Sequence, residues 1–208
     1  AFNLKKLGKE NILIETGYPR NDLMFNFDES YADSVRESLG INKNKKVILY
    51  APTFRDNQHD GAGYVYDTHL DFRRLQQAIG DEYVVLFRAH YFVANQFDFD
   101  KYTGFVYDVS DLDDITPLYT ISDLLITDYS SIYIDYLILN RPMIFLPYDK
   151  EKYLQGRGMN FEYDKVTPGA KPESLREFMD RIHETFSGKD PYFAERQRCN
   201  DFFNEVRQ

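Results

Sequence analysis

Two serines stand at the junction of an apolar strand-like run and an apolar helix-like run. The residues from Leu124 to Thr127 suit a buried strand, and those from Ile132 to Leu139 suit a buried helix. Ser130 and Ser131 lie between the two runs, where either is a good N-cap. The backbone N–H groups and hydroxyls at such a helix start can bind a phosphate group. The serines could instead only cap the helix, and the residues alone leave both interpretations open.

A carboxylate follows these serines at helical spacing. Asp135 comes four residues after Ser131, so one helical turn places both side chains on the same face. A carboxylate there can accept hydrogen bonds from the two hydroxyls of a ribose, and a nucleoside diphosphate would then span the serines and Asp135. Otherwise Asp135 needs a buried partner, because an unpaired acid in an apolar helix is costly.

Cationic side chains follow two other strand-like runs. Arg55 comes shortly after the run 47–50, and Arg88 and His90 come directly after the run 83–87. A pyrophosphate needs such cations and hydrogen-bond donors, and it needs no obligatory metal. Either arginine could instead pair with an aspartate at the same edge of the sheet. A histidine at a solvent-facing strand end has little packing value, so we interpret His90 as functional.

Strand-like and helix-like runs alternate along the chain. Continuous apolar strands between helices are typical of a parallel sheet that is covered on both faces. We therefore predict an α/β fold, a Rossmann-like three-layer domain whose polar groups meet at the carboxyl edge of the sheet. We expect strands at 12–17, 47–50, 83–87, 105–108, 124–127 and 143–146, a turn at 19–22, and helices at 28–39, 70–79, 115–121, 132–139, 172–186 and 191–206.

Composition argues against several classes of protein. The net charge of −9 disfavours a general nucleic-acid binder, because a phosphate backbone requires a basic face. No apolar run approaches the ~20 residues of a membrane span, and the single Cys199 rules out an intramolecular disulfide framework. The chain lacks the GxGxxG pattern of NAD binding and the GxSxG elbow of serine hydrolases. The acidic run at 108–114 lacks EF-hand spacing, so we expect no metal and no cofactor.

An ordered series of motifs is more specific than any one of them. TGYPRND, YAPTFRD, FRAH, DVSDLDDITPLYTISDLLITDYSSIYIDY, RPMIFLPYD and RGMNFEYD together resemble the CDP-glycerol glycerophosphotransferase family, the polymerases and primases of teichoic acid synthesis. The resemblance runs from about Thr16 to Gly169 and implies the C-terminal half of a GT-B fold. We interpret 1–208 as a single donor-nucleotide-binding domain, with a linker and first strand region at 1–15 and C-terminal helices at 172–208. The chain has no start methionine, and we expect a longer protein whose N-terminal acceptor domain is absent here.

The resemblance also implies an activity. Glycerol phosphate, or a related polyol phosphate, would move from CDP-glycerol to a lipid-linked or polymeric hydroxyl acceptor that the missing domain binds. The isolated fragment is expected to be inactive, because the base that activates the acceptor would lie in that domain. The full-length protein is expected in the cytoplasm, peripheral on the inner face of the cell membrane. The alternatives are a GT-B nucleotide-sugar glycosyltransferase or epimerase, and a nucleotide-binding module without catalysis.

The same resemblance assigns the site residues. His90 would be the catalytic residue that contacts the donor phosphates, while the two serines would hold the pyrophosphate and Asp135 the ribose. A family segment that ends in Pro-Gly-Pro is Pro168-Gly169-Ala170 here, a small departure that we place in a loop. The expected donor-binding residues are Pro52, Thr53, Arg55, Arg88, Ser130, Ser131, Asp135 and Arg157.

Overall fold

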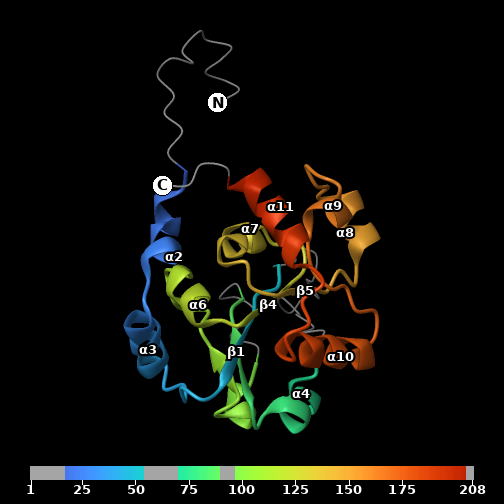
Figure 1. Cartoon of the computed structure of the whole chain (residues 1–208). Coiled ribbons are helices and arrows are strands. Elements are labelled where there is room, and N and C mark those ends of the chain that lie inside the picture. Colours follow the sequence, from blue (N-terminus) through green and yellow to red (C-terminus); the bar gives the residue numbers. More distant parts are fainter. Residues whose placement is uncertain (1–16, 54–69, 90–96, 205–208) are drawn as a thin grey trace.

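The structure, a computed structural model, describes residues 17–53, 70–89 and 97–204. His90, Arg55 and nearly all of the strand expected at 12–17 lie outside the described residues. Within the described ranges, the strands form one parallel sheet in the order β3-β2-β1-β4-β5 (Figure 1). No helix of these ranges is long and apolar enough to cross a membrane.

The strands are the apolar runs of the sequence, and almost all of their residues are buried. Their bounds are β1 (Lys46–Tyr50), β2 (Tyr83–Phe87), β3 (Val106–Asp108), β4 (Leu124–Thr127) and β5 (Met143–Phe145). Successive side chains of a strand point to opposite faces of the sheet. Leu49 accordingly joins one hydrophobic core, and Ile48 and Tyr50 join the other. The predicted α/β three-layer domain is therefore confirmed.

Helices cover each face of this sheet. Figure 1 shows α3 and α6 on one side and α4 and α10 on the other, in agreement with the two cores. The first face carries α2 (Asp22–Asn26), α3 (Glu29–Ser38), α6 (Thr116–Ile121), α7 (Ile132–Tyr136), η4 (Leu137–Leu139), α8 (Lys150–Gly156), α9 (Tyr163–Val166) and α11 (Phe193–Phe203). The second face carries α4 (Phe72–Ile79), η3 (Phe99–Tyr102) and α10 (Leu175–Phe186).

Local side chains set where the longer helices begin. Asp28, Asp71 and Ser174 cap α3, α4 and α10, and each accepts a hydrogen bond from the backbone N–H three residues further on. The helices predicted at 28–39, 70–79 and 115–121 are confirmed to within two residues. The helix predicted from 172 begins at Leu175, because Ser174 is its cap.

Two short segments differ from the sequence prediction. The turn expected at 19–22 is a 3₁₀ helix, η2 (Pro19–Asn21), which leads into α2. Proline at the first position favours this helix, because its fixed φ suits a helical start and the lost N–H would have no partner there. The helix expected at 132–139 changes to 3₁₀ geometry at Leu137 and ends at Asn140, whose φ of 48° is left-handed. Helices α8 and α9 were not predicted.

The segment Pro168–Ala170 lies against the sheet. Ala170 forms an isolated parallel bridge with Ile144, and the N–H of Phe145 donates to the Ala170 carbonyl at 2.8 Å. A Cβ on Gly169 would come within 2.4 Å of the Met143 carbonyl oxygen. Only glycine permits so close an approach between the two backbones.

Candidate functional site

The order of strands in the sheet reverses between β1 and β4. The chain leaves β1 toward α4 on one face and leaves β4 toward α7 on the other. Such a reversal opens a crevice at the carboxyl ends of the two strands, where open α/β proteins bind ligands. Pro52 and Thr53 follow β1, and Ser130 and Ser131 follow β4. The fold therefore brings these four predicted residues to one edge of the sheet.

Asp128 joins the two loops that border this crevice. Asp128 is only 1% exposed. Its Oδ1 accepts a hydrogen bond from the backbone N–H of Thr53 at 2.8 Å and another from the Thr53 hydroxyl at 2.5 Å. The same oxygen accepts from the N–H of Tyr129 at 2.6 Å. The Thr127 hydroxyl adds a bond to the Ala51 carbonyl at 2.7 Å. This function of Asp128 was not predicted from the sequence, although an acid directly after a buried strand is a signal for it.

Replacing Asp128 by alanine should therefore destabilise the fold. The backbone N–H groups of Thr53 and Tyr129 lose a shared acceptor, and each buried donor left unsatisfied costs about 1–3 kcal/mol. We expect the free energy of unfolding in urea to fall by about 3 kcal/mol. Asp113→Ala changes an exposed aspartate and should stay within about 0.5 kcal/mol of the parent chain. Equal losses in the two variants would contradict this function of Asp128.

The two serines are only weakly used by the helix that they precede. The Oγ of Ser130 accepts from the N–H of Ile132 at 3.4 Å, and Ser131 is exposed and makes no side-chain cap bond. Helix α7 has five residues, so its dipole is small. A phosphate held here would depend mainly on the hydroxyls and on nearby side chains. Capping alone does not account for two serines at this point.

The Asp135 carboxylate accepts hydrogen bonds from two side chains near the start of the described residues, Arg20 and Asn21. Nη2 of Arg20 donates to its Oδ2 at 3.0 Å and to its Oδ1 at 3.3 Å, and Nδ2 of Asn21 donates to Oδ1 at 3.1 Å. The expectation that an acid in this helix needs a partner is therefore met. The contact of Asp135 with a ribose stays a prediction. The sequence predicts a turn at Arg20 and Asn21 and gives no sign that they pair with Asp135.

Arg88 braces the loop that follows β3. Its Nη1 donates to the carbonyl oxygens of Val109 at 2.9 Å and Leu112 at 2.6 Å, and no ion pair to aspartate forms within the described ranges. Burial lowers the pKa of Arg88, while the nearby carboxylates of Asp114 and Asp113 oppose that change. Nε and Nη2 remain without a partner among the described residues, so Arg88 can still meet an anion.

Arg157 is the C-cap of α8, a helix that packs on the loop after β4. It is exposed at the C-terminus of α8, and its N–H donates to the Tyr153 carbonyl at 2.9 Å. The Tyr153 ring stacks on that of Tyr129, with centroids 4.1 Å apart. Because Tyr129 directly precedes Ser130, Arg157 belongs to the surroundings of the site, and its contact with a donor stays a prediction.

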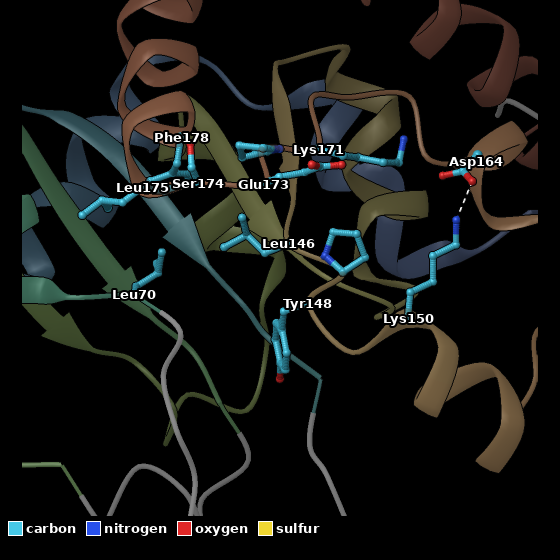
Figure 2. A pocket seen from close by; sticks show the side chains of 12 residues that line it. Leu70, Leu146, Tyr148, Lys150, Asp164, Lys171, Glu173, Ser174, Leu175 and Phe178 are labelled. Atoms are coloured by element: carbon cyan, nitrogen blue, oxygen red, sulfur yellow. Dashed lines mark hydrogen bonds and ion pairs between the residues drawn. The ribbon is translucent and has the colours of Figure 1, made fainter.

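A separate pocket of about 720 Å³ opens at the carboxyl end of β5. Figure 2 shows Leu146 and Phe178 among its apolar walls and the ion pair between Lys150 and Asp164 at one side, with Nζ and Oδ2 2.5 Å apart. Burial lowers the pKa of Lys171, which also lines the pocket. None of the predicted donor-binding residues lies among the described residues that line it. In the described part of the chain, no three His, Cys, Asp or Glu side chains gather closely enough to hold a metal ion.

Comparison with known proteins identifies the family. The family model described as "CDP-Glycerol:Poly(glycerophosphate) glycerophosphotransferase" matches residues 1–208. A teichoic acid poly(glycerol phosphate) polymerase of Bacillus subtilis (strain 168) is 44% identical over 178 residues, which are 84% of this chain and 24% of the relative. A teichoic acid poly(ribitol-phosphate) polymerase of Bacillus spizizenii is 41% identical over 180 residues, 84% of this chain and 28% of the relative.

A solved structure gives the same result. A variant of the wall teichoic acid polymerase TagF soaked with CDPG superposes with a TM-score of 0.86 and 38% identity, over 95% of this chain and 49% of that chain. The likeness confirms the predicted GT-B type of fold for this domain. The chain spans about half of the TagF chain and about a quarter of the two curated relatives. With the family model matching its whole length, the chain belongs to the CDP-glycerol:poly(glycerophosphate) glycerophosphotransferase family.

Proposed function

We propose that this chain is the donor-binding domain of an enzyme that transfers glycerol phosphate, or a related polyol phosphate, from a CDP carrier to a hydroxyl acceptor. The polymer would be teichoic acid or a related capsular polymer. The observation that carries the proposal is the family match over residues 1–208, joined to relatives named as poly(glycerol phosphate) polymerases. The acceptor, lipid-linked or polymeric, would bind to an N-terminal domain of a longer protein, and that protein would be peripheral on the inner face of the cell membrane.

The crevice between β1 and β4 suits the chemistry of a diphosphate. In the proposed reaction an acceptor oxygen attacks the β-phosphorus in line, the bond from that phosphorus to the bridging oxygen breaks, and CMP leaves. The site must neutralise charge on the departing phosphate and hold the donor in line. The hydroxyls of Ser130 and Ser131 and the remaining donors of Arg88 would act on the phosphate oxygens, with His90 as the catalytic residue. Pro52, Thr53, Arg55 and Arg157 complete the proposed donor site.

Two polyols are candidates for the donor. Relatives of nearly equal identity are named for glycerol phosphate and for ribitol phosphate. Titrating the chain with CDP-glycerol, CDP-ribitol and UDP-GlcNAc separates the possibilities by calorimetry. Tighter binding of either CDP-polyol supports the proposal. Tighter binding of UDP-GlcNAc would favour a nucleotide-sugar enzyme, and donor binding without turnover by the full-length protein would leave a binding module.

Removing the two serine hydroxyls should weaken donor binding more than folding. A hydrogen bond to a charged phosphate contributes about 1–3 kcal/mol, so Ser130→Ala with Ser131→Ala should raise the Kd for the CDP-polyol at least tenfold. The matched control is Ser34→Ala with Ser38→Ala, because those two hydroxyls donate to backbone carbonyls within α3. A Kd that is unchanged by the first pair, with the fold intact by circular dichroism, would reject the serines as a phosphate site.

A further inference from the structure

Asp135 is held by two side chains that lie more than a hundred positions away in the sequence. We call Arg20, Asn21 and Asp135 the Asp135 cluster. Arg20 and Asn21 belong to η2, and Asp135 lies in the first turn of α7. Asn21 is 4% exposed and directs its amide at Oδ1, whereas Nη2 of Arg20 reaches both carboxylate oxygens. The carboxylate therefore has a fixed orientation.

The three contacts do not use up the acceptor capacity of this carboxylate. Oδ1 accepts from both neighbours, while Oδ2 accepts from Arg20 alone among the described residues. An ionised carboxylate offers about four lone-pair positions, so Oδ2 can take a further hydrogen bond. The Asp135 side chain is 12% exposed, which leaves part of it open to a ligand.

Arg20 also offsets the negative charge of the Asp135 carboxylate. A bare carboxylate one helical turn from Ser131 would repel the phosphates of a nucleoside diphosphate, because like charges at short range disfavour each other. Arg20 cancels that charge and, at 60% exposure, keeps Nε and Nη1 without a partner in the described part of the chain. Its guanidinium also lies over the Tyr18 ring, 4.8 Å from the centroid, and this contact limits its movement.

We propose that Arg20 and Asn21 are positioning residues for nucleotide selection. Asn21 fixes Oδ1, Arg20 offsets the negative charge, and Oδ2 is thereby presented to a ribose hydroxyl of the donor. The inference rests on the proposed function, since it presumes a cytidine diphosphate donor in the crevice. It extends the site to a segment that the sequence analysis treated as a turn.

A purely structural brace is the alternative, and its expected contribution is small. An ion pair with one partner 60% exposed contributes little to stability, because water screens the attraction between the two charges. Such a brace would act on melting temperature and would leave selection among nucleotides unchanged. The ratio of Kd values for 2′-deoxy-CDP and CDP therefore distinguishes the two.

The experiment measures that ratio by calorimetry for the parent chain and for Arg20→Gln, Arg20→Lys, Asn21→Ala and Asp135→Asn. We expect the parent chain to bind CDP at least about tenfold more tightly than 2′-deoxy-CDP, the effect of one hydrogen bond to a charged group. Arg20→Gln and Asn21→Ala should bring the ratio toward one, and Arg20→Lys should restore part of it. In the Asp135→Asn background, Arg20→Gln should not change the ratio further.

The control is Arg181→Gln, which removes an arginine paired with Glu184 in the last turns of α10 and should leave both Kd values unchanged. A parent chain that selects CDP, with Arg20→Gln and Asn21→Ala keeping the full ratio, would overturn the inference and leave the proposed function standing. A parent chain that binds neither cytidine nucleotide would overturn both this inference and the proposed function. Melting temperatures within a few degrees of the parent show that the variants are folded.

Discussion

Arg196→Met is expected to lower the free energy of unfolding by about 3 kcal/mol, because it removes a fully buried guanidinium that several acceptors share and leaves the partly buried Asp190 carboxylate unpaired. The Arg196 side chain is fully buried in α11. Nη1 donates to one oxygen of Asp190 at 2.9 Å, and Nη2 donates to the other. Nε and Nη2 also donate to the side chain and the carbonyl of Asn140, both at 3.1 Å. Methionine would fill the space and satisfy none of these acceptors.

The same helix supplies the control for this prediction. The Arg198 side chain is 72% exposed, and its Nη2 lies 3.7 Å from Oε1 of Glu195. Arg198→Met should therefore lower the free energy of unfolding by less than about 1 kcal/mol. Urea unfolding of both variants at one pH gives the comparison. Similar losses of unfolding free energy for Arg196→Met and Arg198→Met would show that the buried contacts of Arg196 stabilise the fold no more than an exposed ion pair does.

The contacts of Arg196 meet the helical segment of the site only at its far end. Asn140 ends η4 with a left-handed backbone, and η4 continues directly from α7, which carries Asp135. By holding Asn140, Arg196 ties α11 to the end of this helical segment. We therefore expect Arg196→Met to weaken nucleotide binding only through loss of folded protein, with an unchanged Kd per folded molecule.

The layers of the fold were predictable because their signals are local. Strands β1, β2, β4 and β5 are largely apolar runs that are buried on both faces of the sheet, whereas β3 ends at the exposed Asp108. Helices α3 and α4 have side-chain caps and an apolar face, which the sequence shows directly. Helix α8 has no fully buried residue, and its sequence KEKYLQG carries no apolar periodicity. Its position depends on the stacking of Tyr153 on Tyr129, a contact that no local pattern reveals.

The candidate site was predictable only in part. Ser131 is the N-cap of α7 and Asp135 lies in its first turn, so the two belong to one helical segment as expected, with Ser130 directly before it. Arg20 and Asp135 are 115 residues apart, and their contact follows from how η2 packs beside α7. The sequence contains no rule that pairs them. The hydrogen bonds of Arg88 to carbonyl oxygens depend in the same way on the path of the loop after β3.

His90→Ala is expected to lower the turnover of the full-length enzyme about 100-fold or more with little change in KM for the donor. Loss of a general acid or of an oxyanion-type donor typically costs 10²–10⁴-fold, because such a group acts mainly on the charge that develops in the transition state. The residue lies outside the described part of the chain, and the prediction rests on its sequence position, two residues after Arg88.

His183 supplies the matched control, since it is an exposed histidine on α10. His183→Ala should leave turnover of CDP-glycerol, measured as CMP release, within about twofold of the parent enzyme. Neither variant should shift the melting temperature by more than a few degrees, because a polar side chain outside the apolar runs of the sequence supports little of the core. Near-normal turnover in His90→Ala would remove the proposed catalytic residue, and the transition state would then depend on the serines and arginines of the crevice alone.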